Sequence, residues 1–248
     1  MEREMKSSKI SDRLSAVASC INAERVVADI GADHAQLLIY LAERGWLKKG
    51  IAGEVNRGPF QNAQKNVREA GLEYQIDVRL GDGLDVLNPG EAEVIVLAGM
   101  GGATITSILS QGNDKLSHVK QLILQPNNHG EQVRRWLYHQ GWEIDQEELV
   151  NDGEILYEII SARPGNPDQP YKASPFEKEM MEKLGPLLCQ KHHPLLPKKV
   201  MEEISSVDRI LQGLQSARSP QGELRRKELQ LQREKWEDVR EWLLKEKI

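Results

Sequence analysis

Short apolar runs alternate with amphipathic stretches along the first 140 residues of the chain. Runs rich in β-branched residues predict strands over Val26–Ile30, Gly50–Val55, Gln75–Leu80, Val94–Ala98 and Lys120–Gln125. Apolar positions at helical spacing predict helices over Ala35–Arg44, Gly58–Ala70, Ala103–Leu109 and Glu131–Gln140. Because parallel strands need crossover connections, this alternation predicts an α/β fold with a doubly wound, largely parallel sheet.

The last two strand patterns of this region break the alternation. Trp142–Val150 and Glu154–Ala162 flank Asn151-Asp152-Gly153, residue types that tolerate positive φ and favour a tight hairpin turn. An antiparallel hairpin that closes a parallel sheet is unlike a dinucleotide-binding domain, which ends on another parallel strand. It favours the class I (Rossmann-like) methyltransferase version of the fold.

A helical segment follows the proline-rich stretch Arg163–Pro170, which we expect to be a linker without regular structure. We expect a first helix over Phe176–Gln190. Two heptad seams come next, formed by Val200, Ile204, Val207, Leu211 and Leu214 and, after a break at Ser219–Gly222, by Leu229, Trp236, Val239 and Leu243. The sequence thus predicts two domains, residues 1–165 and a helical coiled-coil domain over 166–248.

This helical domain has two interpretations. It could serve only to dimerise or brace the first domain, or its basic residues, including Arg225, Arg226 and Lys227, could guide RNA. Residues 166–248 hold 16 Lys and Arg against 14 Asp and Glu, whereas the remainder holds 17 against 24. The overall charge of −5 lacks the electrostatic footprint of a nucleic-acid-binding protein, but a local basic face can still bind RNA. Seams that close within one hairpin favour a monomer.

Composition narrows the class of protein. The 248 residues are 39% hydrophobic and 29% charged, and no run approaches the roughly 20 apolar residues of a membrane span. The N-terminal residues Met1–Lys9 lack the apolar segment of a secretory signal, so we expect a cytoplasmic protein. Cys20 and Cys189 have no partners at metal-ligand spacing, and the adjacent His192 and His193 diverge, so we expect no metal site.

Acidic residues follow three of the predicted strands. Asp29 ends the first strand, where bare backbone N–H groups beside Gly31 suit a carboxylate and the acid suits an ammonium. Glu54 ends the second strand and can accept hydrogen bonds from two ribose hydroxyls. Asp82, in a Gly-Asp-Gly turn after the third strand, can accept from an adenine amine, with backbone at Gly83 or Leu84 meeting the ring. Together these positions predict a site for S-adenosyl-L-methionine.

Asp33 and His34 stand where a dinucleotide site would place glycine. A carboxylate there repels a diphosphate, so NAD is disfavoured. The alternative for these two residues is structural: Asp33 would cap the following helix and His34 would pack locally. Both alternatives are compatible with cofactor contact.

The fourth strand ends in glycines, at a position that faces the sulfonium and the methyl acceptor. Gly99, Gly101 and Gly102 allow a flat substrate to approach the backbone closely. Enzymes that methylate the exocyclic amine of adenine have an Asp or Asn, prolines and an aromatic residue here, and this chain has neither the acid nor the aromatic. A ring nitrogen such as N1 already presents a lone pair and needs alignment more than a general base. The Gln125–Asn127 amides could bind a base edge; alternatively this is a polar turn with Asn128 as a helix cap.

Taken together, these motifs resemble the bacterial tRNA (adenine-N1)-methyltransferases that modify adenine 22 in the D-loop region, the TrmK-like family. The segments that carry the resemblance are Ser11–Leu14, Ala28–His34, Ala52–Asn56, Gly58–Phe60, Gly81–Leu84, Ala98–Gly102 and Leu124–Asn127. The helical tail is similar in type. The resemblance implies S-adenosyl-L-methionine as the methyl donor and tRNA as the acceptor.

The resemblance also assigns roles to individual residues. It places the cofactor contacts at Asp29, Gly31, His34, Glu54, Asp82, Gly83, Gly99 and Met100, and the border of the acceptor pocket at Arg13, Gly101, Pro126 and Asn127. To these we add Asp33, Val55 and Leu84 as cofactor contacts and Gly102 and Gln125 as acceptor contacts, and we expect Gly101 and Asn127 to be the catalytic residues. Roles for Asn128, His129 and Gly130 stay open.

Two other functions are compatible with the sequence. The first keeps the chemistry and changes the acceptor to another RNA base, a small molecule or a protein, which the acidic net charge favours. The second is a catalytically inactive RNA-binding or scaffolding protein. Methyl transfer to unmodified tRNA would distinguish all three.

Overall fold

The computed structural model describes residues 9–21, 25–214 and 219–245. The first eight residues, on which the expected absence of a secretory signal mainly rests, lie outside these ranges. The chain forms two compact units, Met1–Leu187 and Leu188–Ile248. No helix in the described ranges is long and apolar enough to cross a membrane.

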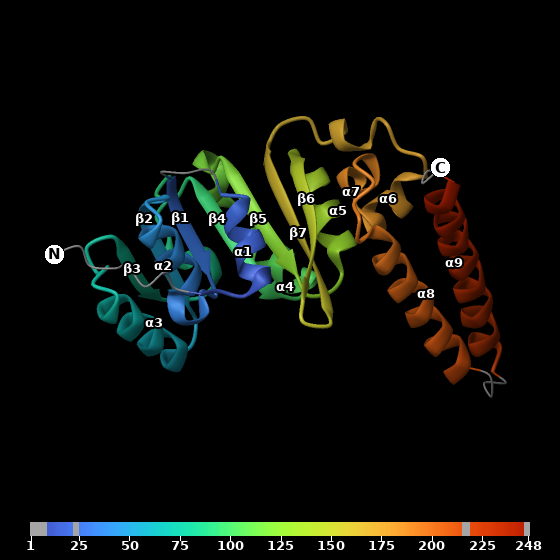
Figure 1. Cartoon of the computed structure of the whole chain (residues 1–248), viewed down its shortest axis with the longest axis horizontal. Coiled ribbons are helices and arrows are strands. Elements are labelled where there is room, and N and C mark those ends of the chain that lie inside the picture. Colours follow the sequence, from blue (N-terminus) through green and yellow to red (C-terminus); the bar gives the residue numbers. More distant parts are fainter. Residues whose placement is uncertain (1–8, 22–24, 215–218, 246–248) are drawn as a thin grey trace. The chain divides into compact units, whose positions relative to one another are not determined.

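The first unit is built on a seven-stranded sheet with the strand order β3-β2-β1-β4-β5-β7-β6 (Figure 1). The strands are β1 (Arg25–Ile30), β2 (Leu47–Glu54), β3 (Ile76–Leu80), β4 (Val94–Met100), β5 (Gln121–Pro126), β6 (Trp142–Asp152) and β7 (Ile155–Pro164). Strands β1 to β5 are parallel, and β7 lies antiparallel between β5 and β6. This is a mixed α/β, Rossmann-like sheet.

Helices cover both faces of the sheet (Figure 1). The helical segments of this unit are α1 (Asp12–Ser19), η1 (Asp33–Ala35), α2 (Gln36–Glu43), α3 (Arg57–Glu69), η2 (Gly83–Val86), α4 (Gly102–Gln111), η3 (Asn113–His118), α5 (Gly130–His139), η4 (Gln169–Tyr171) and α6 (Lys178–Leu184). Apolar residues of α1, α2 and α3 form one core cluster, and those of α4 and α5 form the other.

Strand β4 shows why the predicted strands are almost continuously apolar. Val94 and Val96 belong to the core cluster under α1, α2 and α3, whereas Ile95 and Leu97 belong to the cluster under α4 and α5. Since both faces are covered, alternating side chains are all buried. The carboxyl ends of the parallel strands therefore meet along one edge, which is where the predicted site residues lie.

Two predictions about helices need correction. Helix α1 was not predicted, although Ser11 gives a signal for it: the Ser11 hydroxyl caps the helix by accepting from the Leu14 N–H at 3.2 Å. The single helix expected over Phe176–Gln190 is two, α6 and α7 (Pro186–Gln190), because Gly185 adopts a φ of 99° and precedes a proline.

The stretch expected to be an irregular linker, Arg163–Pro170, is partly regular. Arg163 and Pro164 pair with β6 as the end of β7, and Gln169 begins the η4 turn, in which Pro170 is buried. Pro164 can occupy the end of β7 because the last residue of a strand does not need its N–H as a donor.

A buried arginine explains why the first unit extends to Leu187 and not to Gly165. The Arg134 guanidinium donates to Glu147 at 2.6 Å, to Glu158 at 2.7 Å and to the backbone carbonyl of Glu182 at 3.1 Å. The Leu187 N–H also donates to Glu147, at 2.7 Å. Because a buried charge must be paired, these contacts bind α6 to the sheet domain. The boundary between compact units therefore lies 22 residues beyond the predicted one.

The second unit contains the helices α8 (Leu196–Gly213) and α9 (Pro220–Lys245). Arg233 forms an ion pair with Asp208 at 2.7 Å, and Arg226 donates to the Leu214 carbonyl at 3.4 Å. Since partners later in α8 contact residues earlier in α9, the two helices run antiparallel. The residues buried between them include Val200, Ile204, Val207, Leu229, Trp236, Val239 and Leu243.

Candidate active site

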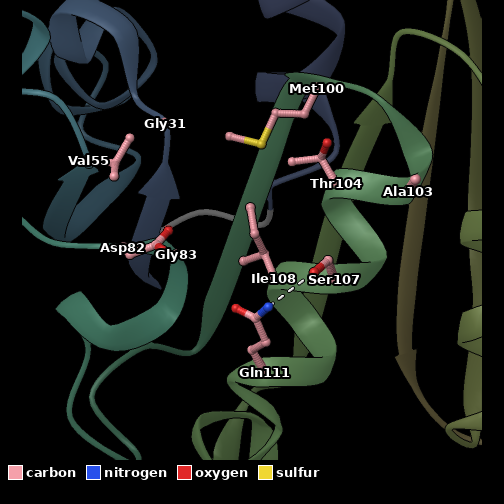
Figure 2. Close-up of a pocket in the computed structure, with 10 residues that line it drawn as sticks. All are labelled: Gly31, Val55, Asp82, Gly83, Met100, Ala103, Thr104, Ser107, Ile108 and Gln111. Atoms are coloured by element: carbon pink, nitrogen blue, oxygen red, sulfur yellow. Dashed lines mark hydrogen bonds between the residues drawn. The ribbon is translucent and has the colours of Figure 1, made fainter.

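A cavity of about 610 Å³ opens at the carboxyl edge of the sheet (Figure 2). It is lined by Gly31, Val55, Asp82, Gly83, Met100, Ala103, Thr104, Ser107, Ile108 and Gln111. The first five were predicted as cofactor residues and come from the ends of four strands. Helix α4 supplies the other five, which form the opposite wall (Figure 2).

The acids at the ends of β1 and β2 form an electrostatically strained pair. Asp29 is buried, and burial together with the negative charge of Glu54 raises the pKa of Asp29 to about 7, while Arg13 opposes this shift. Burial also raises the pKa of Glu54, although a hydrogen bond from the Asp33 N–H to its Oε1, at 2.6 Å, acts in the opposite direction. A cationic group placed here would be attracted by both acids.

Two glycines make room at the cavity wall. Gly31 has a φ of 73°, and a Cβ at this position would collide with the Met100 methyl group, which lies across the cavity (Figure 2). Gly83 has a φ of 50°, and a Cβ there would lie 3.1 Å from the Ile108 side chain. The predicted contact Leu84 has its side chain in the core, so only its backbone could face a ligand.

Asp33 and His34 belong to a turn of unusual backbone conformation. Asp33, His34 and Ala35 all have positive φ. Asp33 does not cap α2, whose N-cap is Ala35 without a side-chain hydrogen bond. The His34 Nε2 lies 3.3 Å from an Asp33 carboxylate oxygen, so the two side chains of this turn contact each other.

Side-chain amides hold the end of β4, the position predicted to face the methyl acceptor. The buried Gln125 Oε1 accepts from Arg13 at 2.7 Å and from the Gly99 N–H at 3.0 Å. The Asn127 amide donates to the Gly99 carbonyl at 2.8 Å and accepts from Gln125 at 3.2 Å. Arg13 also lies over the ring of Tyr157, with Cζ 5.5 Å from the centroid. The structure thus brings Arg13, Gly99, Gln125 and Asn127 together.

Gly101 and Gly102 are packed against the turn between β5 and α5. A Cβ at Gly101 would lie 3.0 Å from the Asn128 Oδ1, and one at Gly102 would collide with the His129 carbonyl oxygen. The Gly102 N–H donates to the Asn128 carbonyl at 3.0 Å. Gly102 is buried, which makes its role one of packing. Asn128 is not the helix cap, since the N-cap of α5 is His129 in a left-handed conformation.

Pro126 is buried at the end of β5 and pairs with Met100, and the register between β4 and β5 shifts between Ala98 and Met100. Within the described residues, no group of three or more His, Cys, Asp or Glu side chains is arranged to hold a metal ion. Cys20 and Cys189, which both lie in the described ranges, are buried and form no disulfide.

The chain is similar to known proteins of one family over most of its length. The model of the TrmK family, described as tRNA (adenine(22)-N(1))-methyltransferase, matches residues 27–245. The chain belongs to the TrmK family. A Bacillus subtilis tRNA (adenine(22)-N(1))-methyltransferase is 38% identical over 222 residues, which cover 89% of this chain and 92% of that protein.

Solved structures agree with this TrmK assignment. The crystal structure of the B. subtilis M1A22 tRNA methyltransferase TrmK has a TM-score of 0.87 and 37% identity, over 94% of this chain and 99% of that one. A Streptococcus pneumoniae structure in complex with S-adenosyl-L-methionine has a TM-score of 0.81 and 34% identity, over 94% of this chain and 100% of that one. The Rossmann-like sheet therefore has the family's architecture.

Sequence reasoning missed two groups of residues around the site. The first is the α4 wall, for which the spacing of Thr104, Ser107 and Gln111 on one helix face was an available signal. The second is Tyr157, which β7 brings next to Arg13 although the two are far apart in the sequence. No sequence spacing could have indicated that contact.

Proposed function

We propose that this chain transfers a methyl group from S-adenosyl-L-methionine to N1 of adenine 22 in tRNA. The observation that carries the proposal is a glycine-lined cavity that Asp82 lines, at the sheet edge where the buried Asp29 and Glu54 stand at the ends of β1 and β2. This edge adjoins an amide network that contains no general base at the end of β4. Membership of the TrmK family supports the same reaction.

The donor set of the cavity fits the cofactor. Asp29 would bind the ammonium of the methionine tail, Glu54 the ribose hydroxyls, and Asp82 with the backbone at Gly83 and Leu84 the adenine ring. The further contacts proposed are Gly31, Asp33, His34, Val55, Gly99 and Met100. A dinucleotide fits less well, since the acids at the ends of β1 and β2 and in the turn after β3 would repel a diphosphate bound at this edge.

When bound, S-adenosyl-L-methionine supplies an electrophilic methyl group on a sulfonium. The protein's part is alignment: Asn127 holds the Gly99 carbonyl, and Gly101 gives the acceptor base access to the backbone. Arg13, Gln125, Pro126 and Gly102 would border the acceptor base. N1 of adenine carries a lone pair at neutral pH, so no side chain has to remove a proton before attack.

The fold supports a finer class. Strand β7 lies antiparallel between β5 and β6, which is the terminal hairpin expected of a class I methyltransferase sheet. We assign the antiparallel helices α8 and α9, within the proposed 166–248 coiled-coil domain, to tRNA binding. The protein would act as a monomer in the cytoplasm, where its substrate resides.

Charge reversal tests the role of the helical domain. Arg225→Glu with Lys227→Glu changes two exposed residues of α9 and should raise KM for tRNA about tenfold, while kcat and the Kd for S-adenosyl-L-methionine stay unchanged. The matched control is Lys48→Glu with Lys49→Glu, which makes the same charge change on exposed residues near the start of β2, away from the carboxyl edge. An unchanged KM in the α9 variant would refute this role.

The activity itself is tested with labelled methyl donor and unmodified tRNA, followed by mapping of the modified nucleotide. The expected product is N1-methyladenine at position 22, and tRNA with guanine at that position should accept no label. Label at another base or on a protein would favour a different acceptor. Cofactor binding without transfer to RNA would favour a small-molecule methyltransferase, and no cofactor binding would favour a scaffold.

A further inference from the structure

The connection between β1 and α2 contains a run of left-handed residues. Asp33, His34 and Ala35 have φ values of 26°, 62° and 55°, and none of them is glycine. Such conformations are uncommon for residues with a Cβ, and three in succession persist only where the surroundings hold them. This run separates the cofactor-side end of β1 from α2, so its geometry determines where the Asp33 backbone N–H points.

Contacts from two other elements hold this turn. Glu54 Oε1, at the end of β2, accepts from the Asp33 N–H at 2.6 Å. From the other side, the Asn66 side chain of α3 donates to the His34 carbonyl at 3.0 Å. The N–H groups of Gly31 and Ala32 donate to Gly53 at 2.8 and 3.3 Å, which fixes the start of the turn.

The two side-chain contacts are not equivalent. Glu54 Oε1 accepts a hydrogen bond from the Asp33 N–H. In the proposed function the same carboxylate would also bind the ribose hydroxyls, so Glu54 has two roles. Asn66 lies outside the cavity lining and is half-buried on the helix that packs against the turn. Asn66 can therefore hold the turn whether or not the cofactor is bound.

We propose that Asn66 is a positioning residue of the cofactor site. By holding the His34 carbonyl, it keeps the 33–35 turn left-handed and keeps the Asp33 N–H directed at Glu54. Without this contact the turn relaxes toward commoner backbone conformations, and Glu54 loses the donor that orients it. This inference rests on the proposed function, since it takes Glu54 to be a cofactor ligand.

The test substitutes Asn66→Asp, which keeps the shape and replaces the amide donor by an oxygen that repels the His34 carbonyl. Calorimetry with S-adenosyl-L-methionine alone should give a Kd about tenfold above that of the wild type, the change expected from losing one partly buried hydrogen bond. KM for the cofactor should rise in parallel, while kcat at saturating cofactor and KM for tRNA stay within about twofold. Asn62→Asp is the matched control, because Asn62 is exposed on the same helix one turn earlier.

A second substitution distinguishes the turn from a general loss of stability. Ala35→Gly makes the left-handed conformation cheaper, so in the Asn66→Asp background it should restore part of the lost affinity. Asn66→Ser provides a less disruptive replacement should the aspartate variant fail to fold, as judged by circular dichroism and thermal melting. Its Kd is expected to rise in the same direction.

The outcomes separate this inference from the proposed function. Wild-type protein that does not bind the cofactor would remove the proposed function itself. If the wild type binds and the folded Asn66 variants bind within twofold of it, Asn66 is not a positioning residue and the function stands. An affinity loss that Ala35→Gly leaves unchanged would likewise overturn the inference, because the amide would then act through something other than the turn.

Discussion

The carboxyl ends of β1 and β2 differ from those of β4 and β5 in what they are built from. At the first two, buried acidic side chains dominate: burial and the charge of Glu54 raise the pKa of Asp29, and burial raises the pKa of Glu54. At the other two, glycine backbone is held by side-chain amides, with Gln125 and Asn127 both bonded to Gly99. The half of the site at β1 and β2 is therefore defined by its negative charge, and the half at β4 and β5 by a fixed backbone conformation.

This difference indicates a division of labour. A bound cation stabilises the charged form of a buried acid whose pKa has been raised to about 7, as that of Asp29 has been. The acidic half should therefore govern cofactor affinity. Amides that fix a backbone segment contribute little to binding by themselves, but they set the angle and distance of approach of the two reactants. Substitutions in the two halves should therefore change different kinetic constants.

Asp29→Ala should give the largest effect. It removes the buried carboxylate proposed to face the cofactor's ammonium, and loss of a desolvated charge pair should raise the Kd for S-adenosyl-L-methionine about 100-fold. Calorimetry on the free enzyme measures this directly. Circular dichroism should be unchanged, because removing a strained buried acid does not weaken the core. Normal cofactor affinity in this variant would contradict the proposal that Asp29, at the end of β1, binds the ammonium group of the cofactor.

Asn127→Ala should affect turnover and not cofactor binding. Losing the bond to the Gly99 carbonyl frees the end of β4, and kcat should fall about 30-fold through misalignment of the reactants. Single-turnover methylation and cofactor calorimetry separate the two quantities. The comparison between the halves would fail if the cofactor Kd rose as much as kcat fell.

The acidic half should also make cofactor affinity depend on pH. The raised pKa of Asp29, about 7, means that the free protein binds a proton there that a cationic ligand displaces. The Kd should therefore fall about tenfold between about pH 6 and about pH 8. Asp29→Asn should remove this component and leave any dependence that comes from the cofactor's own amine.

The same shift affects stability in a defined direction. A carboxyl whose pKa is higher in the folded than in the unfolded state stabilises the fold below its unfolded pKa and loses that contribution as the pH rises toward about 7. Thermal melting of the unliganded protein should therefore show a Tm that decreases across this range, and the decrease should be smaller in Asp29→Asn.

The two halves also differ in how far the sequence predicted them. The acids could be located because each follows a recognisable strand, and in a parallel sheet the carboxyl ends of strands meet at one edge. Strand positions were correct to within a few residues for the same reason: an apolar run buried on both faces is a strong signal. Asp29, Glu54 and Asp82 needed only these two facts.

The half of the site at β4 and β5 depends on contacts between segments that are distant in sequence, and such contacts leave no periodic pattern in the sequence. Arg13 reaches Gln125 only because the unpredicted helix α1 packs on the sheet, and Tyr157 reaches Arg13 only because β7 is inserted next to β5. The run of three left-handed residues was likewise not predicted: Asp33 and His34 are types that tolerate positive φ, but nothing in the sequence favours it for Ala35. The compact unit that ends at Leu187 was not visible in the sequence, because the Arg134 contacts that join α6 to the sheet come from elements distant along the chain.

The α4 wall tests whether the comparison holds beyond the strand ends, and it should give the smallest effect. Ser107 and Gln111 line the cavity and are hydrogen-bonded to each other at 3.2 Å (Figure 2). Since each already has a partner and water can replace either, Ser107→Ala or Gln111→Ala should raise the cofactor Kd by about threefold at most. Thr106→Ala is the control, because the Thr106 hydroxyl donates to the Ala103 carbonyl of its own helix, away from the cavity lining. If the cofactor Kd rose tenfold or more in the Ser107 or Gln111 variant, residues of α4 would contribute to cofactor affinity as well as the buried acids. The division of the site into two halves with separate functions would then be wrong.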